Sequence, residues 1–465
     1  MTDTLTTESA GGTAVFAGVF AGIGGTGARM VQPAGMRWRR PRMARWVAGL
    51  VLSGLLAVTA GPATTASALP GTAPATRYNL LDLTSFTPKL YNTPIPVAIN
   101  SSGEVVGDVF SGGRPSASGP SQLADLASVT SRRTVAGSVA VPHVFVFEND
   151  RLTVLPTPRG VTQAWVAGLN DSGDFTVALC RGYNCNHYYV VHALFAGGKD
   201  SFSWTPLESA NTGTAGLGPI AANGDVVGAI ANPQLTVGVV WKRSADGSYS
   251  LPVALGTDPH AGHFARAYVP LSISSGSGHD LEGGVEVTPS FYPAGSPALW
   301  GPRFVHDFGY IGSETIAMTT GFESTVAAVG CPLPVPACSP ACPIDAMLLT
   351  LADVGGTPKV TASLTLENPS RRTHCGVSPL GVTMDPAGRP FTVGLMALYG
   401  TQRYLPEAVI WIGRRLEALN GQEVAPRGTN LQWAVGVNSA GSIIGTGIIG
   451  GVKDSAYVLS PTGSW

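Results

Sequence analysis

The residues with the most definite chemistry are six cysteines. An even number of cysteines in an exported chain favours disulfides. Cys180 and Cys185 flank a segment of four residues and are expected to pair with each other. The sequence does not choose among the three possible pairings of the other four, which are Cys331, Cys338, Cys342 and Cys375. A zinc cluster within 331–342 is the alternative, which an oxidising compartment disfavours.

A second group of residues has the chemistry of ligand binding. Several tyrosines occur in segments expected to be loops, beside polar or charged residues. Aromatic faces next to hydrogen-bonding groups suit a sugar or an extended peptide. The candidate ligand-binding residues are Tyr183, Tyr292, Tyr399, Arg403 and Tyr404. The alternative is that these side chains only anchor their loops against the protein.

Metal and cofactor chemistry find little support. His260 and His263 have a spacing that a metal ion could use, but no third or fourth ligand is indicated nearby. The segment 22–27 matches the pattern G-x-G-x-x-G formally, yet no acidic residue occurs between Glu8 and Asp82 to complete a dinucleotide site. We therefore predict no metal site and no cofactor.

Motifs of catalysis are also missing. The chain contains neither a G-x-S-x-G nor an H-E-x-x-H pattern. Asp280, Glu282 and Glu286 could approach the axis of a propeller, but their spacing alone does not define a pair of carboxylates. Whether the chain is an enzyme stays open, with a non-enzymatic role favoured. The alternatives are a secreted glycan hydrolase or lyase with acids at the propeller axis, and a purely structural surface protein.

A recurring sequence motif indicates the secondary-structure elements that would position these residues. It consists of an apolar strand, an Asn/Asp/Ser turn closed by glycine, and a second apolar strand. Asn or Asp caps such a turn, and glycine accepts the positive φ that closes it. Less distinct copies lie at 273–276 and around 318–330. The distinct copies have their turn glycine at Gly103, Gly173, Gly224, Gly388 and Gly441.

Each of these hairpins is followed by a second pair of strands, for example 143–147 and 152–155. The aromatic residue that ends the third strand is interpreted as an anchor between sheets. Units of four short strands and about 50 residues are typical of propeller blades. The predicted fold is therefore an all-β β-propeller of seven four-stranded blades. Residues 78–83 are expected to complete the last blade by pairing with 456–459, which removes an exposed sheet edge.

An export signal precedes this domain. Residues 36–68 contain a basic segment, an apolar run over 46–60 and the A-x-A cleavage site at Ala66 and Ala68. The apolar run is shorter than the roughly 20 residues of a membrane-spanning helix. We expect a disordered leader over 1–35 that is untranslated or dispensable, a signal peptide over 36–68, and a single propeller domain over 69–465. The mature chain would be secreted, with no stable membrane insertion.

Charge excludes one further class of partner. Only 12% of the residues are charged, the net charge is −1, and the body of the chain has no block of Lys or Arg. Nucleic acid is therefore not an expected partner. Carbohydrate or cell-wall polymer is the expected partner, and we expect the chain to be a monomer.

The repeats also carry a resemblance. The turn followed by Val-Val-Gly, together with His-Val-Phe at 143–145 and His-Ala-Leu at 192–194, resembles the bacterial extracellular HAF-repeat family. The resemblance spans most of residues 78–465. It implies export and a propeller-like repeat, and it implies no reaction and no catalytic residues.

These observations predict a secreted, non-enzymatic repeat protein that binds a cell-envelope or environmental polymer. In a propeller, the turns between the first two and the last two strands of a blade share one face, and the other connections share the opposite face. The long connections are expected on that second face, which is the predicted binding surface, because variable loops on a rigid scaffold commonly carry function. They are 111–140, 180–189, 258–266 and 331–345.

Overall fold

The computed structural model describes residues 78–463, and every described residue belongs to one compact unit that contains Thr76–Trp465. For strands between 267 and 330, and at some other strand ends, only the backbone is described. The predicted leader (1–35) and signal peptide (36–68), with Ala66 and Ala68, lie outside the described residues. The gaps within the described range are 93, 112–140, 182–183, 197–198, 209–216, 232–235, 256–266, 276–279, 288–294, 302–303, 308–314, 319–325, 331–345, 354–357, 368–373, 386–387 and 400–403.

The described secondary structure is β-strand apart from one short 3-10 helix, η1 (Leu83–Phe86). Six sheets of the described residues have four antiparallel strands each, in chain order. Sheet 1 consists of β2 (Ile95–Ile99), β3 (Val105–Ser111), β4 (Val141–Glu148) and β5 (Arg151–Val154). Sheet 2 consists of β6 (Gln163–Leu169), β7 (Asp174–Arg181), β8 (Asn184–Ala196) and β9 (Lys199–Leu207). Sheet 3 consists of β10 (Leu217–Ile220), β11 (Val226–Ala231), β12 (Thr236–Trp241) and β13 (Val253–Ala254).

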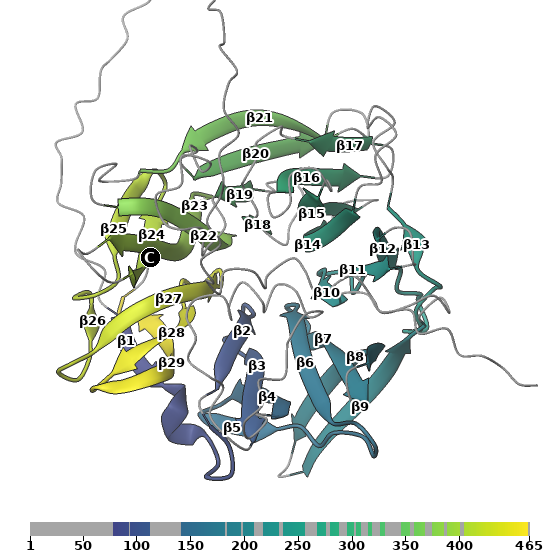
Figure 1. The fold of residues 1–465 in the computed structure, drawn as a ribbon, viewed down its shortest axis with the longest axis horizontal. Coiled ribbons are helices and arrows are strands. Elements are labelled where there is room, and N and C mark those ends of the chain that lie inside the picture. The colour runs from purple at the N-terminus through teal and green to yellow at the C-terminus, as the bar shows by residue number, and fades with distance from the viewer. Residues whose placement is uncertain are drawn as a thin grey trace, which may run out of the picture. The chain divides into compact units, whose positions relative to one another are not determined.

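The next three sheets repeat this order (Figure 1). Sheet 4 consists of β14 (Ala267–Ser275), β15 (Asp280–Val287), β16 (Gly295–Gly301) and β17 (Phe304–Asp307). Sheet 5 consists of β18 (Thr315–Met318), β19 (Val326–Gly330), β20 (Met347–Asp353) and β21 (Pro358–Thr365). Sheet 6 consists of β22 (His374–Met384), β23 (Pro390–Tyr399), β24 (Tyr404–Ile412) and β25 (Arg415–Ala418).

The last sheet, sheet 7, joins the two ends of the described chain. Its strand order is β26-β1-β29-β28-β27, and its strands are β1 (Tyr78–Asp82), β26 (Glu423–Val424), β27 (Asn430–Val437), β28 (Ile443–Ile449) and β29 (Val452–Pro461). β1 pairs antiparallel with β29, with Leu80 opposite Leu459. This is the pairing that the repeats predict. The two-residue strand β26, which the sequence did not suggest, adds to β1 in parallel.

The sheets follow one another in a closed ring within this unit (Figure 1). The first strand of each sheet contacts the sheet before it: β6 contacts sheet 1, β10 contacts sheet 2, and so on to β27 against sheet 6. The ring closes because β2 contacts β27 and β28 of sheet 7. The prediction of an all-β β-propeller is therefore confirmed as a fold class.

The hairpin turns have the predicted backbone. The glycine φ values are 85° at Gly103, 79° at Gly173, 90° at Gly224, 75° at Gly388 and 79° at Gly441. In the first of these turns the Asn100 Oδ1 accepts a hydrogen bond from the Glu104 backbone N–H at 3.0 Å. The same cap, four residues apart, recurs from Asn170 and from Asn438. The turn phrase is thus a capped hairpin that only glycine closes without strain.

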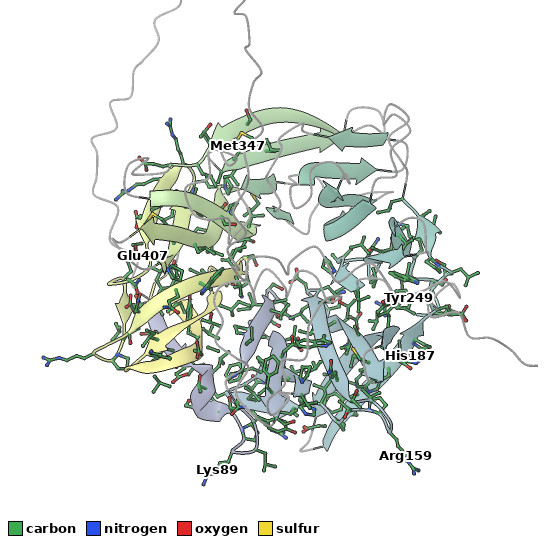
Figure 2. The ribbon with its side chains drawn as sticks, viewed as in Figure 1. Lys89, Arg159, His187, Tyr249, Met347 and Glu407 are labelled. Atoms are coloured by element: carbon green, nitrogen blue, oxygen red, sulfur yellow. The ribbon has the colours of Figure 1, made fainter. Side chains whose placement is uncertain are left out.

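The core lies between neighbouring sheets, where the described side chains pack face to face (Figure 2). The aromatics that end the third strands are buried, with Phe147 5% exposed and Trp241 and Trp411 0% exposed. The indole Nε1 of Trp241 donates to the Glu208 carbonyl at 2.9 Å, and that of Trp411 donates to the Glu367 carbonyl at 3.0 Å. Both acceptors follow the last strand of the preceding sheet, so the predicted role as an anchor between sheets is confirmed for these residues.

One predicted loop is wrong. The segment 180–189 is not a long connection, because β7 continues to Arg181 and β8 begins at Asn184. Tyr188 and Val190 are buried against sheet 3, and Tyr188 packs edge-on against Trp241 with ring centroids 6.2 Å apart. Alternate residues of this polar-looking segment therefore enter the core, and the strand continues to its hairpin.

Candidate functional site

A polar pocket lies over the strands of sheet 2 where they face sheet 3. Its volume is about 430 Å³. Most of its lining side chains carry hydroxyl, imidazole, carboxylate or guanidinium groups. The lining residues are Ser172, Asp174, Val190, His192, Ser203, Thr205, Arg243, Gly247 and Tyr249. We call this the sheet 2–3 pocket.

Hairpin turns place this pocket on one particular face of the ring. Ser172 belongs to the turn between β6 and β7, and Gly247 belongs to the connection between β12 and β13. Both are connections of the tight-turn type, between the first two or the last two strands of a sheet. The pocket therefore opens on the face opposite the one where the sequence predicted the binding surface.

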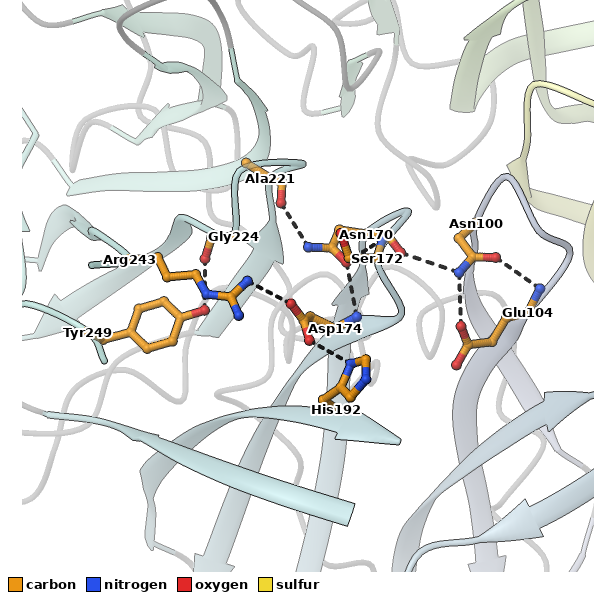
Figure 3. Close-up of polar contacts among 10 residues, drawn as sticks. All are labelled: Asn100, Glu104, Asn170, Ser172, Asp174, His192, Ala221, Gly224, Arg243 and Tyr249. Atoms are coloured by element: carbon orange, nitrogen blue, oxygen red, sulfur yellow. Dashed lines mark hydrogen bonds and ion pairs between the residues drawn. The ribbon is translucent and has the colours of Figure 1, made fainter. Parts of the chain in front are cut away.

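Asp174 is the centre of the pocket's hydrogen bonding (Figure 3). Its Oδ1 lies 2.9 Å from Nδ1 of His192, and its Oδ2 accepts from Nη1 of Arg243 at 2.9 Å. Asp174 itself is buried, at 5% exposed, whereas the side chains of His192 and Arg243 are 37% and 36% exposed. The carboxylate is thus held between two groups that face the pocket.

Sheet 3 holds Arg243 in place. The backbone N–H of Arg243 donates to Asp225 Oδ1 at 2.6 Å, and the Lys242 ammonium lies 3.0 Å from Asp225 Oδ2. Gly224 lets the arginine pass, because a Cβ on this glycine would come within 2.5 Å of Arg243 Cδ. Both the conformation and the missing side chain of Gly224 are therefore needed here.

Tyr249 forms the wall of the pocket on the sheet 3 side. Its hydroxyl donates to the Gly224 carbonyl at 2.9 Å. Burial raises the pKa of this phenol well above its usual value, with Asp174 and Asp225 adding to the effect and Arg243 opposing it. Tyr249 therefore offers the pocket a neutral ring and a fixed hydroxyl across the physiological range.

Glu104 of the neighbouring turn is also buried, at 8% exposed. Its carboxylate accepts from Nδ2 of Asn100 at 2.9 Å (Figure 3). Burial raises the pKa of Glu104 from 4.5 to about 7; the Asn100 hydrogen bond opposes this rise, and the charges of Glu148 and Asp174 add to it. This carboxyl group therefore titrates near neutral pH.

The charges around the pocket nearly cancel. Arg243 is paired with Asp174, and Lys242 is paired with Asp225. The remaining polar lining consists of hydroxyl groups and one imidazole. Such a lining can donate and accept many hydrogen bonds at little net charge, which suits a neutral, polyhydroxylated ligand.

The predicted ligand-binding residues lie elsewhere. Tyr399 and Tyr404 are paired in the backbone ladder at the end of the β23–β24 hairpin. The structure describes only the backbone of these two residues. Tyr183, Tyr292 and Arg403 lie outside the described residues altogether.

The predicted cysteine pair is close in the fold. Cys180 is fully buried and lies opposite Cys185 in the β7–β8 ladder, with only residues 182–183 between the two strands. Cys375 lies on β22, without a described side chain, and Cys331, Cys338 and Cys342 lie outside the described residues.

The acidic residues considered for catalysis belong to sheet 4 and are not part of the pocket lining. Asp280, Glu282 and Glu286 all lie on β15 at positions of the same parity, so they share one face of that strand. Their side chains are outside the described ones. His260 and His263 lie outside the described residues.

Sequence reasoning missed the pocket residues, although a signal was present. An acidic residue directly follows the turn glycine in three successive copies, as Glu104, Asp174 and Asp225. This position is the first residue of the second strand or directly precedes it, and all three side chains are buried. The repetition of an acidic residue at this position was therefore the sequence signal that could have pointed to the pocket.

In the part of the chain that the structure describes, no group of three or more His, Cys, Asp or Glu side chains is arranged to hold a metal ion. No helix among the described residues is long and apolar enough to cross a membrane.

Known proteins provide only distant likenesses. No known protein family and no curated protein matches the chain. Among solved structures, the Dos1 propeller is 11% identical with a TM-score of 0.41, over 83% of this chain and 94% of that chain. The β-propeller domain of the Trilobed protease from Pyrococcus furiosus is 7% identical with a TM-score of 0.42, over 79% and 94%. The SapL1 lectin in complex with alpha methyl fucoside is 12% identical with a TM-score of 0.31, over 71% and 96%. No conclusion about ligand or activity follows from likenesses at this level.

Proposed function

We propose that this chain is a secreted propeller that binds a polyhydroxylated polymer of the cell envelope or the environment, and that the sheet 2–3 pocket is a contact site for it. The observation that carries the proposal is the charge-balanced lining of the pocket, in which Asp174 is held by both His192 and Arg243. Sugars need closely spaced donors and acceptors beside a flat apolar face, and Tyr249 supplies the ring. Binding, rather than cleavage of the polymer backbone, is the proposed role.

The loop-rich face remains part of this proposal as a second contact surface. Its residues are Tyr183, Tyr292, Tyr399, Arg403 and Tyr404. Support comes from the facing positions of Tyr399 and Tyr404 at the hairpin end. A polymer, unlike a small ligand, is long enough to engage more than one site.

The finer architecture belongs to the same proposal. Each sheet is one blade, so that the propeller has seven blades, and β1 completes the last of them. Support comes from the β1–β29 ladder and from the contact of β2 with sheet 7. In this arrangement β1 is paired on both sides, with β29 and with β26, and a monomer is part of the proposal.

Export and disulfide formation are proposed together. The signal peptide over 36–68 would direct the chain to an oxidising compartment, and in such a compartment a disulfide between Cys180 and Cys185 forms and persists. Facing residues of an antiparallel ladder have Cα atoms about 4.5–5.5 Å apart, which is within the range that a disulfide spans. The relationship to extracellular HAF-repeat proteins is also proposed, and it is supported by the repeated sequence motifs.

The proposal is tested by binding of the purified chain to a panel of insoluble and soluble polysaccharides, including cell-wall preparations. Arg243→Gln and Tyr249→Phe remove one charged and one hydroxyl group of the pocket. Arg151→Gln is the matched control, because Arg151 forms an exposed ion pair with Asp200 outside the pocket lining. We expect affinity to fall about tenfold in each pocket variant, since a lost hydrogen bond to a ligand costs roughly 1.5 kcal/mol.

Three outcomes separate the functions under consideration. Loss of binding in the pocket variants but not in Arg151→Gln supports the pocket. Loss only in Tyr292→Ala and Tyr404→Ala moves the site to the loop-rich face. Release of new reducing ends from a polysaccharide would replace binding by the hydrolase alternative.

A further inference from the structure

Three pocket residues form a row across neighbouring strands of sheet 2. In the β7–β8 ladder Asp174 lies opposite His192, and in the β8–β9 ladder His192 lies opposite Ser203. Directly paired residues of an antiparallel sheet point to the same face. The order across the sheet is therefore carboxylate, imidazole and hydroxyl, and all three line the same pocket.

We propose that this row is an ester-cleaving site in which Ser203 is the nucleophile, His192 the general base and Asp174 the residue that positions the imidazole. This activity goes beyond the binding function proposed above and does not depend on it. The substrate class is a carboxylic ester, such as an acyl group on a hydroxyl of a polyhydroxylated compound.

The imidazole has the orientation that this role requires. Its Nδ1 lies 2.9 Å from Asp174 Oδ1, and an ionised carboxylate can only accept, so Nδ1 carries the proton. In neutral His192 the lone pair is then on Nε2. Nε2 lies on the other edge of the ring and points away from Asp174 (Figure 3).

Ser203 lies on the strand that flanks His192 on the side opposite to Asp174. It is exposed on β9, and paired Cβ atoms of neighbouring strands are about 4.5–5.5 Å apart. Among the described residues, neither the Ser203 hydroxyl nor His192 Nε2 forms a hydrogen bond with another side chain. The position of the Ser203 hydroxyl is set by rotation about one bond, χ1, and in ligand-free sites the hydrogen bond between nucleophile and base is commonly long.

The chemical step then balances. The Ser203 Oγ attacks the ester carbonyl carbon while its proton passes to His192 Nε2. The tetrahedral intermediate expels the alcohol, which takes the proton from His192, and leaves an acyl group on Ser203. Water, deprotonated by the same nitrogen, cleaves this acyl-enzyme to the acid and regenerates the serine hydroxyl.

Arg243 is placed to stabilise the negative oxygen of the intermediate. Its guanidinium has five N–H donors, and one of them, on Nη1, donates to Asp174. Arg243 also lines the pocket, and its side chain is 36% exposed. A cation next to the developing oxyanion is a common means of lowering such a barrier.

The test uses the purified full chain and two probes, 4-nitrophenyl acetate and a fluorophosphonate that reacts with activated serines. Mass spectrometry locates the labelled residue. We expect labelling at Ser203, and a fall of about 100-fold in both labelling and esterase rate for Ser203→Ala and for His192→Gln. Ser201→Ala is the matched control, because Ser201 is an exposed serine on the same strand and is not in the pocket lining.

Two results would overturn the proposal. One is labelling or hydrolysis that is equal in the parent chain and in Ser203→Ala. The other is labelling at Ser172, which also lines the pocket, in place of Ser203. Polysaccharide binding is measured in parallel on the parent chain, so that failure of the esterase activity leaves the binding function separately testable.

Discussion

Asn438, in the last sheet, donates a hydrogen bond from Nδ2 to the backbone carbonyl of Asn100 in the first sheet, at 2.8 Å and across 338 residues of sequence. Asn100 in turn donates to the Asn170 carbonyl at 3.4 Å, and Asn170 donates to the Ala221 carbonyl at 3.1 Å. Each asparagine therefore caps its own turn through Oδ1 and links to the next sheet through Nδ2. The link across the ring closure is made in the same way as the links within the ring.

The first prediction concerns this link. Asn438→Asp keeps the Oδ1 cap but replaces the Nδ2 donor by an oxygen that faces the Asn100 carbonyl. Because Asn438 is only 4% exposed, we expect a loss of about 1–3 kcal/mol in the free energy of unfolding. Urea denaturation measures it, and Asn79→Asp, at an exposed position of β1, is the control with little expected change. Equal losses in both variants would contradict the role of the link.

The second prediction distinguishes the effect of backbone strain from the effect of a steric clash with a neighbouring side chain. Gly103 and Gly224 have similar φ values, 85° and 90°, but a Cβ at Gly103 meets nothing within 4 Å, whereas at Gly224 it meets Arg243. Gly103→Ala and Gly224→Ala should each lose about 1–2 kcal/mol of stability. Only Gly224→Ala should also weaken ligand binding, because it displaces Arg243 from the pocket. Thermal unfolding and polysaccharide binding check the pair, and unchanged binding in Gly224→Ala would count against Arg243 as a ligand contact.

The third prediction is a pH dependence of stability. Burial raises the pKa of Glu104 from 4.5 to about 7, so the folded state holds this proton more tightly than the unfolded state. The stability contributed by protonated Glu104 is fully present below about pH 4.5 and is lost as the pH rises to about 7. Glu104→Gln keeps an acceptor for Asn100 and removes the titration.

Urea denaturation at several pH values measures this effect. Between pH 4.5 and 7 the parent chain should lose stability relative to Glu104→Gln, by about 2–3 kcal/mol in all. Parallel pH profiles of the two proteins would show that Glu104 titrates at its ordinary pKa in the fold.

The fourth prediction concerns the cysteine pair. If Cys180 and Cys185 form a disulfide, the denatured, unreduced parent chain exposes no thiol at either residue. Cys185→Ser should then free Cys180 for maleimide labelling and lower the stability by about 2 kcal/mol, as expected for a short closed loop. Peptide mapping by mass spectrometry identifies the labelled residue. Labelling of Cys180 in the unreduced parent chain would contradict the pairing.

Much of the fold was predictable because it depends on local chemistry. The Asn-to-Gly turn phrase predicted the positions of the hairpins, since positive φ at Gly103 or Gly173 is a property of those few residues. The burial of Trp241 and Trp411 and the pairing of β1 with β29 followed from the same repeat. The segment 180–189 was misread because its polar residues resemble a loop, whereas tertiary packing of Tyr188 and Val190 extends the strand.

The sequence by itself determined the repeat, the strand class and the closure, because hydrophobic alternation and turn chemistry act over a few residues. The tertiary structure alone decided the site. Asp174, His192 and Ser203 become neighbours only through the register of two ladders, and Arg243 reaches Asp174 from the next sheet, 69 residues along the chain. Strand register and the packing between sheets depend on contacts between segments that are distant in the sequence. A local sequence pattern therefore does not reveal them.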